Sequence, residues 1–313
     1  MRDYGFGVDI GGTTIKMGLF RVDGTLVEKW EIPTNKEKQG KHILPDIAME
    51  IRTKMKDKEI HRKDVVGVGI GVPGPVTADG TVLKCVNLGW NVFNVEETLS
   101  EMVDLPVKAG NDANIAAMGE MWQGGGKGYK SVVMVTLGTG VGGGIIVDGK
   151  LVSGSNGAGG EIGHIKVSGS EEEACGCGKK GCLEQYASAT GIVKEAKRLL
   201  QRDERPSELR YYNDITAKDI FDLAKDGDEL ATELVEKLGE KLGSALATVS
   251  CVCDPEVYVI GGGVSKAGMI LLNVIQKYYV EKAFHACERT KFELATLGND
   301  AGIYGGVSLV LNN

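Results

Sequence analysis

Residues 4–21 read YGFGVDIGGTTIKMGLFR, and the fold class follows from this stretch. Its first half is an apolar run that predicts a buried strand ending near Asp9. A Gly-Gly-Thr-Thr turn comes next, and the apolar run after it predicts a second strand. The Asp23-Gly24 pair is a strong hairpin signal that leads into a third strand near 25–32. The chain is therefore expected to open with a three-stranded meander whose first turn is rich in Gly and Thr.

The same order of elements returns in the middle of the chain. Residues 131–137 form another apolar run, a glycine-rich stretch follows up to Gly144, and a strand is expected over 145–148. The Asp148-Gly149 pair again signals a hairpin. We interpret the two regions as an internal duplication of architecture, although they share little sequence.

The rest of the chain alternates strand patterns with helix patterns. The run at 65–72 mixes Val and Ile with Gly, which indicates a central strand that another backbone approaches closely. A further strand is expected at 257–260, and helices at 41–58, 111–122, 184–201, 216–226, 228–249, 266–283 and 301–311. Strands followed by helices predict an α/β fold, and the hairpins predict mixed sheets.

The first turn has the residues of a phosphate site. Its members are Gly11, Gly12, Thr13 and Thr14. Glycine lets the backbone turn its N–H groups toward an anion, and the two hydroxyls can donate to phosphate. Lys16 adds a positive charge, whereas Asp9 would repel phosphate and suits a hydrated Mg²⁺. The alternative is a plain hairpin turn, which would need neither two Thr nor an Asp at the strand end.

Two more glycine clusters follow predicted strands. The second includes Gly138, Thr139, Gly140 and Gly142, and the third includes Gly262 and Gly263. The second cluster has a formal Gly-x-Gly-x-x-Gly spacing, but a dinucleotide site needs a helix next, and here a strand follows. We therefore interpret it as a second phosphate cradle. The third follows a strand and precedes a helix, which suits the phosphate or adenosine end of a nucleotide. The sequence has no Gly-Lys-Ser/Thr, so a Walker P-loop is excluded.

The pair Asn111-Asp112 stands directly before a predicted helix. Asp112 could simply cap that helix. Together with Glu161, His164 and Glu184, however, the pair resembles a site for a polyhydroxylated ligand, because such ligands need many donors and acceptors. A hydroxyl that is to be phosphorylated also needs a carboxylate to accept its proton, and Asp112 is our candidate.

A group of metal ligands lies in the middle of the chain. They are His164, Cys175, Cys177 and Cys182, separated largely by Gly and Lys and flanked by Glu161 and Glu184. One His and three Cys form a closed tetrahedral set, which predicts a structural Zn²⁺ with no open position for a reacting water. The seven cysteines are an odd number and no signal peptide is apparent, so a disulfide framework is not expected. A second metal site at Cys251 and Cys253 is disfavoured because no His or Gly-rich turn is near.

Composition narrows the range of partners. With 313 residues and 42% hydrophobic residues, the chain can form one large domain or two medium ones. The net charge of −7 argues against a nucleic-acid or anionic-membrane surface. No apolar run is long enough to span a bilayer, and the start of the chain lacks a signal-peptide pattern. A reduced, cytoplasmic location is expected.

These motifs together resemble the ROK-type sugar kinases, and most closely the glucokinases among them, within the actin/hexokinase/Hsp70 superfamily. The resemblance covers nearly the whole chain. Asp9–Lys16 resembles the family's first phosphate motif, residues 137–144 its second, and Gly261–Ser265 its adenosine motif. Asn111-Asp112 matches the sugar-binding Asn and the catalytic Asp, and the Glu-His-Cys-Cys-Cys-Glu pattern matches the family signature.

The resemblance implies a two-lobed actin/hexokinase-like (ribonuclease H-like) ATPase fold. We expect a small lobe over 1–115, joined by a C-terminal helix at 300–313, and a large lobe over 116–299 that carries the zinc. It also implies ATP-dependent phosphorylation of glucose to glucose 6-phosphate, with ATP, Mg²⁺ and structural Zn²⁺ as cofactors and Asp112 as the general base. The sugar contacts it implies are Gly74, Asn87, Asn111, Asp112, Glu161, His164 and Glu184. His164 would use one ring nitrogen for zinc and the other for a sugar hydroxyl.

Several alternatives stay open at this point. The same residues could serve N-acetylmannosamine, fructose, mannose or allose, and polyphosphate could replace ATP. Some family members are repressors with an N-terminal helix-turn-helix, but this chain begins directly with the phosphate motif, which disfavours a non-catalytic sugar sensor. The closed four-ligand metal set disfavours a zinc hydrolase. Family members are often dimers or tetramers, so a homodimer or homotetramer is expected.

Overall fold

The computed structural model describes residues 2–311 and divides the chain into two compact units. The first unit comprises the chain up to Gly128, Gly144–Gly160 and the chain from Leu297 onward. The second comprises Tyr129–Gly143 and Glu161–Thr296. The lobe boundaries expected near 115 and 299 stay a prediction, and residues 1 and 312–313 of those lobes lie outside the described residues.

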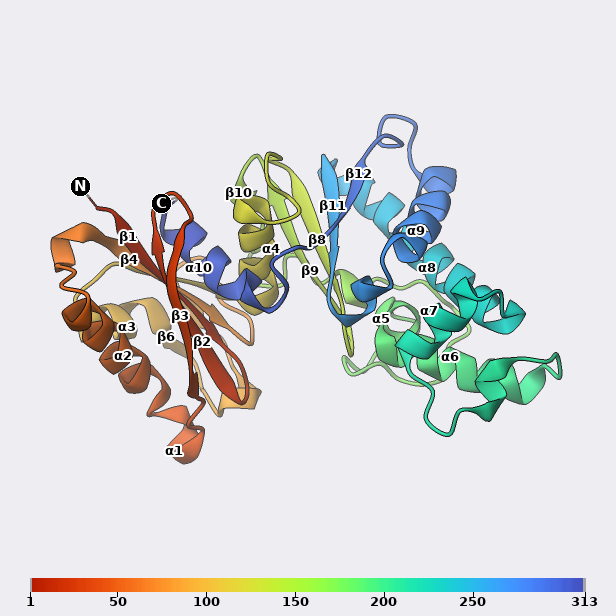
Figure 1. Ribbon diagram of the computed structural model, residues 1–313, viewed down its shortest axis with the longest axis horizontal. Coiled ribbons are helices and arrows are strands. Elements are labelled where there is room, and N and C mark those ends of the chain that lie inside the picture. The colour runs from red at the N-terminus through yellow and green to blue at the C-terminus, as the bar shows by residue number, and fades with distance from the viewer. Residues whose placement is uncertain (1, 312–313) are drawn as a thin grey trace. The chain divides into compact units, whose positions relative to one another are not determined.

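The first unit is built on a five-stranded mixed sheet with the order β3-β2-β1-β4-β7 (Figure 1). Strands β1, β2 and β3 pair antiparallel, and β1, β4 and β7 pair parallel. The strands are β1 (Tyr4–Ile10), β2 (Thr14–Arg21), β3 (Leu26–Pro33), β4 (Val65–Val72) and β7 (Val107–Asn111). The predicted meander and the predicted mixed sheet are thus confirmed.

Helices cover both faces of this sheet. The main apolar core lies against α2 (Ile43–Asp57) and α3 (Val95–Val103), and it contains Phe6 and Val8 of β1. Because side chains alternate along a strand, Gly7 faces the other way, toward α10 (Ala301–Leu311). A Cβ built on Gly69 would lie 1.7 Å from the Gly306 carbonyl oxygen of α10. The close backbone approach predicted for the 65–72 strand is therefore confirmed.

Helix α4 (Asp112–Gln123) packs against α10 in the same way. A Cβ on Gly305 would lie 1.7 Å from the Ile115 carbonyl oxygen, so the two helix backbones are in contact. Such contact fixes the position of α4 on the sheet. The helix begins at the residue proposed above as the general base, so its placement matters for the site.

The second sheet repeats the strand pattern of the first. Its order is β10-β9-β8-β11-β12, in which β10 pairs antiparallel with β9 and β11 pairs parallel with both β8 and β12. The strands are β8 (Val132–Leu137), β9 (Val141–Val147), β10 (Lys150–Leu151), β11 (Val257–Gly261) and β12 (Lys291–Leu294). The predicted duplication of architecture is confirmed.

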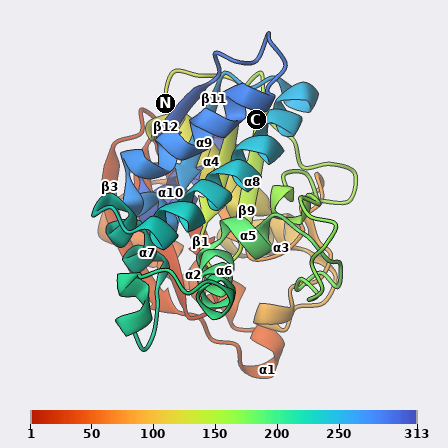
Figure 2. The ribbon, with the colours of Figure 1, turned by 90° about the vertical axis from the view of Figure 1, so that its right-hand side faces the viewer.

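Helices α8 (Glu229–Cys253) and α9 (Met269–Lys282) pack together in the second unit, and Figure 2 shows them running alongside each other. Hydroxyl groups buried under them are hydrogen-bonded. The Ser250 hydroxyl of α8 lies 2.7 Å from that of Tyr258 and 2.8 Å from that of Tyr279. Each of these buried hydroxyls therefore has a hydrogen-bond partner, and none is buried with its hydrogen bonds unmade. Cys251 and Cys253 belong to the last turn of α8, beyond the helix end expected at 249.

Three local expectations need correction. The helix expected over 184–201 is two helices, α5 (Glu184–Ala187) and α6 (Ala189–Arg202), because Ser188 is extended and caps α6 through the Gly191 N–H. The segment after Gly262 is a 3₁₀ turn (Gly263–Ala267), and α9 starts only after it. Strand β9 begins at Val141 rather than 145, so Gly142 lies in a strand and not in the turn. Small residues masked the strand signal there.

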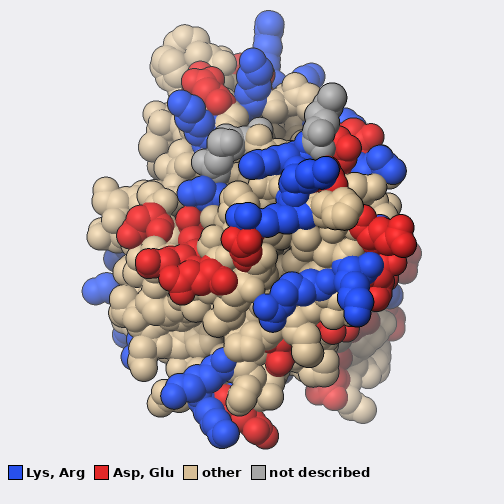
Figure 3. Space-filling view, turned by 90° about the vertical axis from the view of Figure 1, so that its left-hand side faces the viewer, with Lys and Arg blue, Asp and Glu red and all other residues tan. Residues whose placement is uncertain are grey.

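Smaller elements complete the described chain. They are α1 (Glu37–Gly40), β5 (Thr81–Val82), β6 (Phe93–Asn94) and α7 (Ala217–Lys225). Among residues 2–311, no helix is both long and apolar enough to cross a membrane. On the face of the first unit in Figure 3, Lys and Arg lie among Asp and Glu, and Glu28 pairs with both Lys54 and Lys58. Positive and negative side chains are thus interspersed on this face.

Candidate active site

Two carboxylates come together at one edge of the first sheet. The register pairs Asp9 of β1 with Gly71 of β4, and Gly71 with Gly110 of β7, so the three residues form a row across parallel strands. Asp112 follows β7 directly and starts α4. The carboxyl ends of neighbouring parallel strands are where α/β sheets bind ligands. Gly71 is a direct neighbour of the Asp9 carboxyl, since a Cβ built on it would lie in ordinary contact, 3.5 Å from the Oδ1.

Asn111, not Asp112, caps helix α4. The Asn111 Oδ1 accepts hydrogen bonds from the N–H groups of Ala113 (3.0 Å) and Asn114 (3.4 Å). Its Nδ2 donates to the Gly74 carbonyl oxygen at 3.2 Å, which ties the loop after β4 to the helix start. The Asp112 carboxyl accepts a hydrogen bond from the Ala113 N–H at 2.8 Å. Asp112 is thus not the N-cap of α4, because Asn111 caps the helix.

Both acids have raised pKa values. Burial raises the pKa of Asp9 to about 6, the negative charge of Asp112 adds to the rise, and Lys16 opposes it. Partial desolvation by the surrounding protein also raises the pKa of Asp112, although the residue as a whole is exposed and the Ala113 N–H opposes the rise. The charge of Asp112 and the partial burial of Asp9 both disfavour a negative charge on Asp9, which favours a cation or a proton beside the two acids.

The first Gly-rich turn is a tight connection with an open outer side. The Gly11 N–H donates to the Thr14 carbonyl oxygen at 2.9 Å, and the Thr34 hydroxyl donates to the Gly11 carbonyl. A Cβ on Gly12 would meet nothing within 4 Å. The Lys16 side chain is engaged outside this turn, since its Nζ donates to the Asn299 carbonyl oxygen at 3.0 Å. The turn can therefore hold an anion through backbone groups, with Lys16 engaged elsewhere in this structure.

The second Gly-rich turn, in the second unit, is also a tight connection and is one residue shorter. It consists of Gly138–Gly140, with the Gly138 N–H bound to the Gly140 carbonyl at 3.0 Å. The Gly138 carbonyl also accepts the Ala189 N–H at the start of α6. Space outside Gly138 is open, whereas a Cβ on Gly140 would lie 2.6 Å from the Glu184 Oε2. This turn and the Glu184 carboxylate are therefore neighbours.

The four predicted metal ligands converge in the second unit. One ligand atom from each of His164, Cys175, Cys177 and Cys182 lies within 4.8 Å of the others. The Cys177 and Cys182 sulfurs are 3.6 Å apart, and the Cys175 sulfur is 3.7 Å from the His164 Nδ1. The edge of a tetrahedron with Zn–S bonds of about 2.3 Å is roughly 3.7 Å, so the donor set fits a tetrahedral Zn²⁺. Burial raises the pKa of Cys175 to about 12, and only a cation makes a cluster of thiolates favourable there.

His164 presents its two ring nitrogens to different groups. Its Nδ1 faces Cys175 and also lies 3.7 Å from the Glu184 Oε1, whereas its Nε2 lies 3.9 Å from the Glu161 Oε2. Glu184 in turn accepts a hydrogen bond from the Cys175 thiol at 2.7 Å. The three predicted sugar residues of this unit are thus brought together beside the metal ligands. The imidazole thus has one nitrogen at the cysteine cluster and the other toward Glu161, and its expected division between zinc and a sugar hydroxyl stays a prediction.

A cavity of about 370 Å³ adjoins the third glycine cluster. Its walls are the start of α7 and the 3₁₀ turn, and its lining residues include Phe221, Lys218, Gly263, Val264 and Ala267. Gly262 has a positive φ of 84° and packs on Leu137, where a Cβ would lie 2.5 Å from the carbonyl oxygen. The cavity therefore lies next to the second turn, and its largely apolar walls suit a nucleoside.

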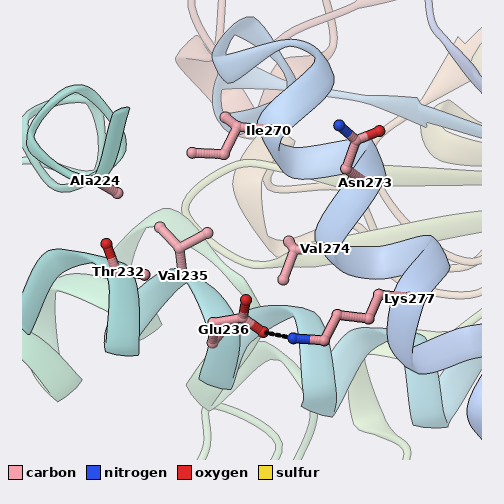
Figure 4. Close-up of a pocket in the computed structure, with 8 residues that line it drawn as sticks. All are labelled: Ala224, Thr232, Val235, Glu236, Ile270, Asn273, Val274 and Lys277. Atoms are coloured by element: carbon pink, nitrogen blue, oxygen red, sulfur yellow. Dashed lines mark hydrogen bonds and ion pairs between the residues drawn. The ribbon is translucent and has the colours of Figure 1, made fainter. Parts of the chain in front are cut away.

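Another cavity of about 400 Å³ lies between α7, α8 and α9 (Figure 4). Its main polar feature is the ion pair between Lys277 and Glu236, 2.7 Å apart. It contains none of the residues singled out by the sequence. We assign it no part in the site, although it is as large as the first.

Asn87 and Gly74 are the less central of the predicted sugar contacts. Asn87 is exposed on a 3₁₀ turn (Val86–Leu88) that is closed by the backbone pairing of Cys85 with Trp90. Gly74 reaches the site through its carbonyl bond to Asn111. The structure thus ties Gly74 to Asn111, the residue before Asp112, and places Asn87 on a loop of the same unit.

The family model of ROK proteins matches residues 5–313. The chain belongs to the ROK family. A "Glucokinase" from Halalkalibacterium halodurans is 45% identical over 309 residues, covering 97% of this chain and 94% of that protein. An N-acetylgalactosamine kinase from Shewanella sp. is 32% identical and covers 97% of this chain and 96% of its own length. The crystal structure of a ROK family glucokinase from Streptomyces griseus, in complex with glucose and AMPPNP, has a TM-score of 0.74 at 34% identity and covers 99% of this chain and 100% of that one.

Sequence reasoning missed one wall of the 370 Å³ cavity in this ROK protein. Helix α7 was expected, and its start at Thr216 is marked by a capping box with Asp219. Nothing in its periodicity says that this helix start faces Gly263. The pairing is a tertiary contact between segments far apart in the chain, so the local sequence held no signal for it.

Proposed function

We propose that this ROK protein transfers the γ-phosphoryl group of ATP to the 6-hydroxyl of glucose, as an ATP-dependent glucokinase. The observation that carries the proposal is Asp112 at the start of α4. Its carboxylate is released from capping by Asn111 and lies near Asp9 at the edge of the sheet. A kinase needs one carboxylate to accept the hydroxyl proton and another to hold the metal that accompanies ATP.

Asp112 acts as the general base. Its raised pKa makes the carboxylate a better proton acceptor than an aspartate of ordinary pKa. The amide of Asn111 orients a sugar hydroxyl next to it. The proton moves to the Asp112 carboxylate as the hydroxyl oxygen attacks phosphorus in line with the departing ADP.

Asp9 would hold Mg²⁺, because its partial burial and the nearby charge of Asp112 favour a cation beside its carboxylate. When bound, Mg²⁺ neutralises the charge of the phosphates. The N–H groups of the Gly11–Thr14 and Gly138–Gly140 turns bind the phosphate oxygens. The 370 Å³ cavity beside Gly263 takes the adenosine.

The proposed zinc site organises the sugar-binding residues of the second unit. His164, Cys175, Cys177 and Cys182 would hold a structural Zn²⁺, and a set of four protein ligands would leave no position for a reacting water. Its role is to fix the imidazole of His164 beside Glu161 and Glu184. These three side chains then bind sugar hydroxyls.

A kinase for another hexose or N-acetylhexosamine is the second candidate. The identities to a glucokinase and to an N-acetylgalactosamine kinase, 45% and 32%, favour glucose. A homodimer or homotetramer and a cytoplasmic location remain predictions from the sequence.

The experiment is sugar-dependent release of ADP from ATP, measured for the zinc-loaded protein with a panel of sugars. The panel holds glucose, N-acetylmannosamine, N-acetylgalactosamine, fructose, mannose and allose, with polyphosphate as a second donor. The proposal expects the highest kcat/KM for glucose with ATP. ADP release that no sugar stimulates would mean a sensor rather than a kinase, and a higher kcat/KM for another sugar would replace glucose.

A further inference from the structure

The cysteine-bearing loop has very little regular structure of its own. Residues 165–183 contain two isolated bridges, Lys166 with Cys182 and Ala174 with Lys180. A loop of this length loses much conformational entropy when it is fixed, so strong contacts must hold it. Zinc would hold the part from Cys175 to Cys182. A different group of contacts holds the part before it.

Arg198 of α6 makes those contacts. Its two terminal nitrogens donate to both oxygens of Glu171, each at 2.9 Å, which is a bidentate pair. The same guanidinium reaches Glu173 at 2.8 Å and Glu195 at 2.9 Å. Bidentate arginine–carboxylate pairs fix both distance and orientation. Arg198 therefore fastens the loop to α6 at two loop residues.

Glu171 is an internal anchor rather than a surface residue. Its side chain is 1% exposed, and Arg198 holds the pKa of this carboxyl well below its usual range, at about 2. The Tyr186 hydroxyl also donates to it, at 3.0 Å. A buried carboxylate that loses its cation partner becomes strongly unfavourable, so the pair cannot be opened without moving the loop.

Helix α5 links this anchor to the proposed sugar site. Three consecutive residues of α5 point to three different partners. Glu184 lies at His164 and Cys175, and Tyr186 bonds to Glu171. Gln185 accepts the N–H groups of Gly181 (2.8 Å) and Cys182 (3.0 Å) and donates to the Glu173 carbonyl. A single helical turn thus couples the Arg198 contacts to the Glu184 carboxylate.

We infer that Arg198 is a positioning residue for sugar binding: it holds Glu171 and Glu173 so that α5 presents Glu184, and it does so independently of zinc. The inference rests on the proposed function for its sugar readout. It assigns the loop two anchors, one metallic and one ionic. Removing the ionic anchor leaves the four metal ligands in place but misplaces the turn that carries Glu184.

The test compares R198M with R198K and with a matched control, R205M. Arg205 also makes a bidentate pair, with its Nε 3.1 Å from the Asp203 Oδ1 and a terminal nitrogen 2.6 Å from the Oδ2, and it bonds to Glu233 at 2.6 Å. None of its partners belongs to the cysteine-bearing loop. A fourth variant, E171Q, probes the same contact from the loop side and keeps the side-chain shape.

Three quantities are measured on the zinc-loaded, full-length variants. They are the glucose Kd by titration calorimetry, the KM for ATP, and the zinc content. For R198M and E171Q we expect the glucose Kd to rise roughly 10-fold, the effect typical of lost supporting contacts at a site. Zinc should stay near one per chain, with the KM for ATP within about twofold. R198K should fall in between, because an ammonium cannot make the bidentate pair.

Equal glucose Kd values for R198M, E171Q and R205M would overturn the inference, and so would loss of zinc from R198M. Hydrogen exchange provides a readout that needs no sugar. The Gly181 and Cys182 amides should exchange faster in R198M than in R205M. If the wild-type protein binds no sugar at all, the proposed function fails, and this exchange comparison alone decides the role of Arg198.

Discussion

The two five-stranded sheets of this protein have the same topology but different residues at the same edge. In the first sheet, the second-to-last residue of β1 is Asp9, and the residue after β7 is Asp112. At the corresponding positions of the second sheet stand Thr136 of β8 and Ala295 after β12. The duplicated scaffold therefore carries acids in one copy only. The comparison teaches that strand order provides the edge, while individual side chains provide the chemistry.

The largest expected effect belongs to the acid at the end of the first sheet. D112N should lower kcat by about 10² to 10⁴-fold, because the amide cannot accept the hydroxyl proton. Glucose should still bind, since Asn111 continues to cap α4 and orient the sugar. Coupled kinetics and calorimetry measure the two quantities. Near-normal kcat in D112N would remove the role assigned to this residue.

The second-largest effect is expected from the comparison of two equivalent strand-end residues, Asp9 of β1 and Thr136 of β8. D9N should lower kcat/KM for Mg-ATP by roughly 10²-fold, since it removes a carboxylate that faces the metal and phosphates. T136V, its counterpart on β8, should change the same quantity much less because it removes a hydroxyl and no charge. Steady-state kinetics over a range of Mg²⁺ concentrations measure both. Similar losses in the two variants would mean that the edges are chemically equivalent.

The third-largest effect is expected at the proposed zinc ligands, which all lie in the second unit. C177S should lower the zinc content and raise the glucose KM roughly 10-fold, because His164 and Glu184 lose their shared support. We expect the protein to remain folded, since Arg198 still holds the loop through Glu171. C251S, at an exposed position on α8, is the control. Unchanged glucose affinity in zinc-free C177S would show that the metal does not organise the site.

The smallest effect is a dependence of stability on pH. The pKa of Asp9 is raised from 3.8 to about 6 in the folded protein, so the folded state holds this proton more tightly than the unfolded chain does. The favourable contribution of Asp9 is complete below about pH 4 and is lost as the pH rises through 6. Without nucleotide or metal, D9N should therefore become more stable than the wild type as pH rises from 4 to 6.

Glu171 should change the stability with pH in the opposite direction to Asp9. Its pKa is lowered from 4.5 to about 2 by Arg198, so its contribution is present above about pH 4.5 and is lost as the pH falls toward 2. Chemical denaturation of D9N, E171Q and the wild type at several pH values separates the two carboxylates. A D9N curve parallel to the wild type between pH 4 and 6 would contradict the raised pKa.

The sequence by itself determined the elements and most of the motif residues. The strands of the first meander and the repeated strand-turn-strand order were readable because buried strands are apolar and their turns need Gly or Asp-Gly. The metal ligands were readable because few chemistries other than zinc use one His and three Cys so close together. The helix break at Ser188 and the short strand β12 were not, because capping and edge pairing depend on partners distant in the chain.

Only the tertiary structure decided which of these residues meet. The row from Asp9 through Gly71 to Gly110 exists because three parallel strands end at one edge in matching register. The same holds for helix α7 beside Gly263 and for Arg198 on Glu171. Local sequence encodes conformation through neighbouring residues, whereas these contacts depend on the packing of segments brought together by the whole fold. Motif residues were therefore visible in the sequence, and the contacts that position them were not.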